Sequence, residues 1–306
     1  MRLLRHSTFF ILHSTLALAA LCATTAPDRA DQLREKLTSR DTPYVFVAAH
    51  RADWRYAPEN SLQAIEHAIS IGVDILEVDV QRTADGVLIL MHDETVDRAT
   101  SGKGKISDLT LAEIRALTLR TGAGTRTKHK VPTLEEVLLA IKGRVLINLD
   151  KADRYFDEVA ALLKKTGTTR QAIMKGGKSD AEVRKLYGKY LGEIIYMPVI
   201  DLDKKTARQT IDAFLANTKP YAFEFLYKTD ANPLPKQLAG DLKGKSLIWY
   251  NTLWEGMAGN HEDECAITKT PAAAYGYLID TLGARLIQTD RAEILLAYLR
   301  QRGLHD

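Results

Sequence analysis

Short apolar runs alternate along the chain with longer stretches in which apolar residues recur at helical spacing. The runs that predict strands lie at 44–49, 73–80, 87–91, 145–149, 172–174, 194–199, 221–226, 246–250 and 285–287. Helices are predicted in most of the intervals between them, for example at 153–165, 179–191, 204–216 and 272–282. Because helices separate the strands, the pattern indicates parallel βαβ units. It therefore predicts an α/β protein with the (β/α)8 architecture of a TIM barrel.

One run is left over, because the barrel needs only eight strands. Asp85-Gly86 is a turn signal, and run 87–91 follows run 73–80 after a link that is too short for a parallel crossover. We therefore predict an extra antiparallel hairpin strand within residues 76–92.

Polar residues follow the predicted strands at their carboxyl ends. The set comprises His50, Arg51, Glu77, Asp79, Asp150, Lys151, Lys175, Asn251 and Asp290. In a (β/α)8 barrel those strand ends form one face, and active sites lie on that face. The pattern therefore predicts that these side chains gather at one mouth of the barrel.

The stretch from Ile75 to Asp93 carries the clearest candidate chemistry. Glu77 and Asp79 lie two residues apart in a predicted strand, which puts both carboxylates on one face. If the hairpin forms, His92 returns to their level. Exposed carboxylates with no metal are the plain alternative, but the apolar flanks favour a buried strand, and burying a carboxylate pair without a cation is costly. The stretch thus indicates a metal site with an imidazole at its edge.

The composition and the amino terminus limit the classes of function. The chain has 306 residues, 45% of them hydrophobic, and a formal net charge of +3 without a basic block, which argues against a nucleic-acid partner. Residues 1–26 combine two early arginines, an apolar run and small residues, and predict a cleavable secretory signal and a secreted or periplasmic protein. The apolar run is too short for stable membrane insertion, although an uncleaved anchor is the alternative.

Cleavage near Ala26 would remove Cys22 and leave Cys265 without a partner for an intrachain disulfide. The predicted organisation is then a signal at 1–26, a connecting helix or loop at 27–43, and one barrel domain at 44–306.

Several motifs, taken in order, resemble the glycerophosphodiester phosphodiesterase family. They are His50-Arg51, Pro58-Glu59-Asn60-Ser61, Glu77-x-Asp79, Asp85-Gly86, His92-Asp93, Trp249-Tyr250-Asn251-Thr252 and Gln288-Thr289-Asp290. The resemblance runs from about residue 44 to 291 and implies a TIM barrel of the phospholipase-C-like phosphodiesterase type. It also implies a divalent cation, Ca²⁺ or Mg²⁺, and two histidines that cleave a small-molecule phosphodiester.

The resemblance assigns roles to particular residues. Glu77, Asp79 and Asp150 would hold the metal with hard oxygen ligands. His50 and His92 would serve as general base and general acid, in either order. Candidate substrate-binding residues are Arg51, Lys151, Glu59, Lys175, Glu224 and Trp249. For the last four, a helix start, an ion pair with neighbours or core packing is the alternative.

The chain departs from the family pattern in three places. Ala52 follows His-Arg where the family usually has glycine, the segment 53–56 is aromatic and basic, and Asp150 directly precedes Lys151 instead of lying two residues before a lysine. We expect a divergent branch that acts on a phosphodiester other than glycerophosphocholine. An enzyme that releases a cyclic phosphate and a non-catalytic phosphate- or sugar-binding barrel are the alternatives. The sequence does not predict an oligomeric state.

Overall fold

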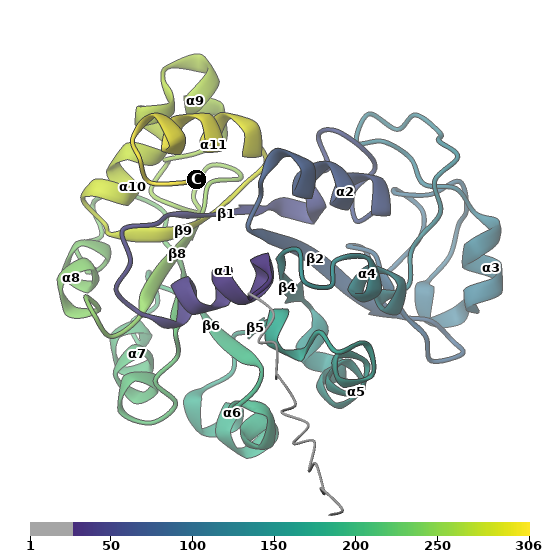
Figure 1. Ribbon diagram of the computed structural model, residues 1–306, viewed down its shortest axis with the longest axis horizontal. Coiled ribbons are helices and arrows are strands. Elements are labelled where there is room, and N and C mark those ends of the chain that lie inside the picture. The colour runs from purple at the N-terminus through teal and green to yellow at the C-terminus, as the bar shows by residue number, and fades with distance from the viewer. Residues whose placement is uncertain (1–26) are drawn as a thin grey trace, which may run out of the picture.

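The computed structural model describes residues 27–306, which form a closed barrel of strands surrounded by helices (Figure 1). The predicted signal segment, 1–26, lies outside the described residues. Within residues 27–306, no helix is both long and apolar enough to cross a membrane.

Eight parallel strands form the barrel. They are β1 (Phe46–Ala49), β2 (Ile75–Arg82), β4 (Leu146–Asp150), β5 (Ala172–Gly176), β6 (Ile195–Asp201), β7 (Ala222–Leu226), β8 (Leu247–Asn251) and β9 (Ala284–Thr289). Strand β1 pairs with both β9 and β2, which closes the sheet. The ninth strand, β3 (Leu88–Leu90), is antiparallel to β2. The predicted barrel and the predicted hairpin strand are both confirmed.

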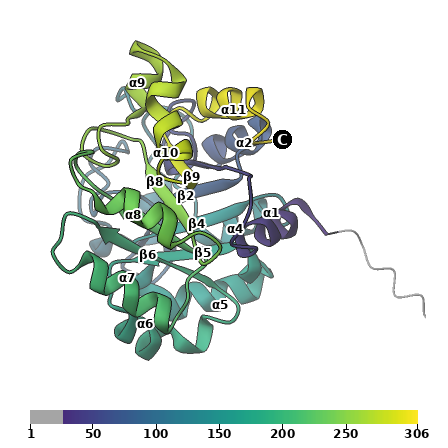
Figure 2. The same ribbon diagram turned by 90° about the vertical axis from the view of Figure 1, so that its left-hand side faces the viewer.

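Helices connect the strands and cover the outside of the barrel (Figures 1 and 2). They are α2 (Leu62–Ile71), α4 (Leu134–Ala140), α5 (Phe156–Thr166), α6 (Asp180–Tyr187), α7 (Ala207–Ala216), α8 (Leu234–Asp241), α9 (Asp263–Thr268), α10 (Tyr277–Asp280) and α11 (Ala292–Gln301). Side-chain caps fix several starts: the hydroxyl of Ser61 accepts from the backbone NH of Ala64, and Thr133 and Ser179 each form a capping box.

Helix α1 (Arg29–Thr38) closes the amino-terminal end of the barrel, which it crosses in Figure 1. Its Leu33 and Leu37 belong to the interior apolar cluster that includes Phe46, Ile75 and Trp249. The segment predicted as helix or loop is therefore a helix that seals the barrel, and the opposite end, where the strands terminate, remains available for a site.

Residues 83–132 form an insertion between β2 and α4. The insertion carries β3 and α3 (Leu111–Ala116), which lies at the right of Figure 1. It has a small apolar core of its own: Ile89, Met91, Val96, Ala99, Ile106, Ile114, Leu119 and Val131. His92 belongs to this insertion, so its position relative to the barrel depends on how the insertion is held.

Three local features are not apparent from the sequence pattern. Helix α8 is short and contains Pro235 and Gly240, which weaken a helical pattern. Helix α9 begins at Asp263, directly after a polar, non-helical stretch. His67 of α2 is partly buried: its Nδ1 lies 2.7 Å from Oδ2 of Asp53, and its ring stacks on Tyr56.

Candidate active site

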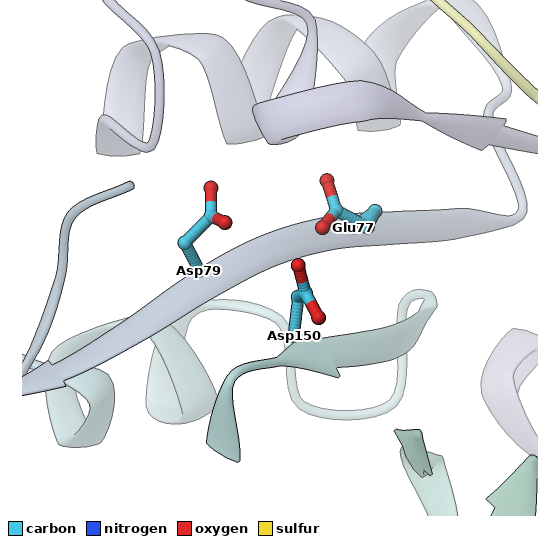
Figure 3. A group of neighbouring side chains, drawn as sticks. All are labelled: Glu77, Asp79 and Asp150. Atoms are coloured by element: carbon cyan, nitrogen blue, oxygen red, sulfur yellow. The ribbon is translucent and has the colours of Figure 1, made fainter. Parts of the chain in front are cut away.

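Three carboxylates meet at the carboxyl ends of β2 and β4 (Figure 3). The parallel register places Asp79 beside Asp150, and Glu77 lies two residues earlier on the same face of β2. One oxygen from each of Glu77, Asp79 and Asp150 lies within 4.8 Å of the others. Glu77 and Asp79 are buried, while Asp150 is partly exposed. The predicted metal ligands are therefore brought together, and their all-oxygen donor set suits a hard cation.

The net charge of the groups around these acids indicates a divalent cation. Four carboxylates and two ammonium groups gather here: Glu77, Asp79, Asp150, Glu224, Lys151 and Lys175. Nζ of Lys151 lies 3.0 Å from Oδ1 of Asp79, and Nζ of Lys175 lies 3.4 Å from Oε2 of Glu224. Arg51, which lies 4.0 Å from Asp79, is paired with Glu59, so this pair adds no net charge. Subtracting two positive from four negative groups leaves two negative charges, which one divalent cation would neutralise.

The crowding of these acids changes their ionisation. Burial and the nearby carboxylate of Asp79 raise the pKa of Glu77 to about 7. Burial opposes ionisation of Asp79 too, but Lys151 and His92 outweigh burial and hold its pKa below the usual value. Without a cation, Glu77 is the carboxylate whose ionisation is disfavoured.

His50 follows β1, and the structure pairs it with the end of β9. Its Nδ1 lies 2.7 Å from Oδ1 of Asp290, which also accepts from Nε1 of Trp54 at 2.6 Å. A carboxylate accepts but does not donate, so Nδ1 carries hydrogen and Nε2 is the nitrogen left for chemistry. Burial lowers the pKa of His50, but the hydrogen bond to Asp290 and the charge of Glu77 outweigh it, so the pKa is raised.

His92 lies next to the other end of the carboxylate group. Its Nδ1 lies 2.7 Å from Oδ1 of Asp93, and its backbone carbonyl accepts from Nζ of Lys151 at 2.5 Å. Since Lys151 also pairs with Asp79, His92 is connected to the carboxylates through its main chain. His50 lies close enough to Glu77, and His92 close enough to Asp79, for each pair to interact electrostatically. The two imidazoles are therefore neighbours of different acids of the same cluster.

Arg51 sits in a strained loop that presents its guanidinium to the carboxylates. Arg51, Ala52 and Asp53 have φ values of +47°, +59° and +66°, a left-handed run that L-residues rarely adopt. The backbone NH of Arg51 donates to Oε2 of Glu77 at 3.0 Å. Its buried Nε has no hydrogen-bond partner among the described residues and lies 4.0 Å from Oδ2 of Asp79. The left-handed φ of Ala52 gives a physical reason for glycine to be preferred there.

Asn60 holds the loop against β2. Its Oδ1 accepts from the backbone NH of Asp79 at 3.1 Å, and its Nδ2 donates to Oδ2 of Asp79 at 3.0 Å. Its own backbone NH donates to the carbonyl of Arg51 at 3.0 Å. Asn60 therefore orders the site.

The other predicted substrate-binding residues occupy different positions. Lys175 and Glu224 are buried beside the carboxylates; burial lowers the pKa of Lys175, but the charges of Glu224, Asp150 and Glu77 raise it above its usual value. Trp249 is fully buried, and its Nε1 donates to Oδ1 of Asn251 at 2.6 Å. Trp249 thus packs in the barrel core and supports Asn251, which donates to Glu224.

The structure adds two residues and one pairing that the sequence did not indicate. Arg98 of the insertion contacts the carboxylates of both Glu59 and Asp93. Trp254 is a half-exposed indole with its ring centroid 6.2 Å from that of His50. Asp290 was noticed at a strand end, but its pairing with His50 spans most of the chain, and no local pattern indicates it.

Comparison with known families gives two matches along the chain. Residues 50–193 match the glycerophosphoryl diester phosphodiesterase family. Residues 196–299 match a second family, described only as a domain of unknown function. Both candidate histidines and the three acids lie in the first match, whereas Glu224, Asn251 and Asp290 lie in the second.

Individual relatives are similar over part of the chain. A glycerophosphodiester phosphodiesterase of Caldanaerobacter subterraneus subsp. tengcongensis is 42% identical over 107 residues, which cover 34% of this chain and 44% of that protein. The chain spans about half the length of the curated relatives it matches.

Solved structures share the fold. A glycerophosphoryl diester phosphodiesterase from Parabacteroides distasonis aligns with a TM-score of 0.73 and 22% identity, over 89% of this chain and 92% of that one. A phosphodiesterase from Oleispira antarctica, solved in complex with the product sn-glycerol-3-phosphate, aligns with a TM-score of 0.62 and 18% identity, over 84% and 97%.

Proposed function

Because this chain belongs to the glycerophosphodiester phosphodiesterase family, we propose that it hydrolyses a glycerophosphodiester or a related phosphodiester to an alcohol and a phosphomonoester. The observation that carries the proposal is the convergence of three carboxylates with two imidazoles and a guanidinium at one barrel end. A barrel that only bound phosphate would have no use for two oriented imidazoles.

The proposal includes a divalent cation, Ca²⁺ or Mg²⁺, held by Glu77, Asp79 and Asp150. The oxygen donors, the two uncompensated negative charges and the raised pKa of Glu77 support this choice. When bound, such a cation neutralises charge on a phosphoryl oxygen and so favours attack on an anionic diester.

The side chains of the chain supply the remaining steps. The guanidinium of Arg51, which is partly exposed and donates to Glu59 through Nη1, is placed to donate to a phosphate oxygen. One imidazole takes a proton from the nucleophile, either water or a neighbouring glycerol hydroxyl, and the other protonates the leaving alcohol. For each histidine, the carboxylate at Nδ1 leaves Nε2 as the nitrogen that exchanges the proton.

Chelation is expected to abolish turnover. EDTA should lower hydrolysis of glycerophosphodiesters by at least about 100-fold, and Ca²⁺ or Mg²⁺ should restore it, since the acids alone repel the substrate. At about 100 times its Kd, the cation should also stabilise the fold by about 2.7 kcal/mol, which thermal unfolding measures without substrate. Activity that survives chelation would contradict the metal assignment.

Phosphorus NMR of the products separates the remaining readings. A panel of glycerophosphodiesters and sugar phosphodiesters should give phosphomonoester signals. A persistent cyclic phosphate would instead favour the lyase alternative, and no product from any member of the panel would favour a binding protein.

The variant Asp290→Asn should change the pH profile. The carboxylate of Asp290 raises the pKa of His50, so its removal should lower that pKa. Whichever limb of kcat/KM His50 controls should therefore move to lower pH, and kcat should fall because the imidazole loses its charged orienting partner. The exposed Asp280→Asn, which loses only a pairing with Arg302, is the control. If neither limb of the pH profile of kcat/KM moves, Asp290 does not set the pKa of His50.

A further inference from the structure

We propose that Arg98 is a positioning residue that couples His92 to Arg51, so that the candidate acid–base group and the candidate phosphate-binding group are set relative to each other. The inference rests on the proposed function for its kinetic consequence. The contacts that support it belong to the fold.

Arg98 makes charge-assisted hydrogen bonds to two carboxylates at once. Its Nη1 and Nη2 donate to Oε2 and Oε1 of Glu59, both at 2.7 Å, in a bidentate pair. Its Nε and Nη2 donate to Oδ2 and Oδ1 of Asp93 at 2.8 and 3.0 Å. The planar guanidinium therefore fixes the direction of both carboxylates as well as their charge.

Each of these carboxylates holds one of the groups proposed to act on the substrate. Oε2 of Glu59 also accepts from Nη1 of Arg51 at 3.0 Å. Oδ1 of Asp93 also lies 2.7 Å from Nδ1 of His92. The result is a continuous path from His92 through Asp93, Arg98 and Glu59 to Arg51.

The path joins two segments of the molecule, the insertion and the loop after β1. His92, Asp93 and Arg98 lie in the insertion, which has its own apolar core. Arg51 and Glu59 lie in the loop after β1, and Glu59 is buried. Lys151 connects the main-chain carbonyl of His92 to Asp79. The ring of His92 makes its described hydrogen bond to Asp93. Arg98 thus controls the direction of the ring and not only the place of the insertion.

Lysine would not replace Arg98. A single ammonium group cannot make two bidentate contacts in one plane, although it keeps the positive charge. The variant R98K therefore separates geometry from charge, and R98M removes both. The control is K103M in the same insertion, where Lys103 makes an exposed ion pair with Asp97.

The experiment measures kcat and KM of R98M, R98K and K103M on a glycerophosphodiester that the wild-type enzyme hydrolyses. Misplacement of a reacting group by about 1 Å costs on the order of 100-fold, so R98M should lose about that much in kcat. We expect kcat of R98K to fall at least about 10-fold and kcat of K103M to match that of the wild type. If Arg98 acts through Asp93, the double variant R98M/D93N should have a kcat no lower than that of the single variant D93N. In a further variant, R98A, guanidinium added at a non-denaturing concentration should partly restore kcat.

A second readout does not depend on turnover. In ¹⁵N NMR spectra, the wild type should show His92 with hydrogen on Nδ1, and R98M should show a mixture of tautomers. Circular dichroism identifies a variant that has failed to fold, in which case R98K decides. Wild-type kcat and an unchanged His92 tautomer in R98K and R98M would overturn the inference. A wild-type enzyme without activity on any diester would count against the proposed function, and the tautomer would then decide the role of Arg98 alone.

Discussion

Replacing His50 or His92 with alanine is expected to lower kcat by about 1,000-fold or more, because each removes one partner in general acid–base catalysis. The two losses should not multiply fully in the double variant, because a proton that cannot be taken makes the missing proton donor less important. Rates on the preferred diester, measured at saturating substrate and metal, test this. Activity that survives both changes would remove the basis of the mechanism.

The matched control is His129→Ala. His129 lies in the insertion, as His92 does, and only its backbone NH has a described hydrogen bond to a side chain. It should keep wild-type kcat. His50→Ala also leaves Asp290 with Trp54 as its remaining side-chain donor, which should cost on the order of 1–3 kcal/mol of stability. Urea unfolding of each variant therefore separates lost chemistry from lost fold.

The sequence predicts the barrel well because each strand is a local apolar run and each connection is a local amphipathic helix. The same alternation places Glu77 and Asp79 on one face of β2, and the short link after Arg82 forces the hairpin. Since parallel strands all end at one face, polar residues at the strand ends predict a shared site without any knowledge of pairing.

Pairing between distant side chains is what the sequence does not reveal. His50 and Asp290 lie 240 residues apart in the sequence, and they meet only because β1 pairs with β9. The contacts of Arg98 depend on the fold of an irregular insertion that has little periodicity. Trp249 belongs to one of the motifs that resemble the family. Its burial in the barrel interior is set by the register of β8 against its neighbouring strands, which the local sequence does not reveal.

The two family matches meet within one closed sheet. The first match supplies the proposed metal ligands and both imidazoles, and the second supplies Asp290, Glu224 and Asn251. Neither half contains a complete site, because Asp290 orients His50, while Glu224 pairs with Lys175. Closure of the barrel is thus a requirement of the proposed chemistry.

The variant Glu77→Gln is expected to abolish metal-dependent turnover, with a loss of about 1,000-fold, and yet to stabilise the metal-free protein at alkaline pH. The lost activity follows from removing one of the three carboxylates and one of the two uncompensated charges. The gained stability follows from burial and Asp79, which raise the pKa of Glu77 to about 7 from its usual 4.5. A raised pKa means that the folded state binds a proton more tightly than the unfolded state.

The sign of the pH effect follows from that difference. The contribution of Glu77 to stability is fully present below its unfolded pKa and is lost as the pH rises through 7. The loss in the metal-free wild type is of the order of 3 kcal/mol, because a tenfold difference in proton affinity between the folded and unfolded states corresponds to about 1.4 kcal/mol. Glutamine has no proton to lose, so E77Q in EDTA should be more stable than the wild type at pH 8 and similar to it at pH 5.

The control for this variant is Glu66→Gln, an exposed residue paired with Arg144, which should show no such gain. Added Ca²⁺ should reverse the order of stability at pH 8, because only the wild type then binds the cation with all three acids. Urea unfolding of both proteins at pH 5 and pH 8, with EDTA or with Ca²⁺, measures these differences. Equal stability of E77Q and the wild type under every condition would show that Glu77 is neither destabilised by its surroundings nor a metal ligand.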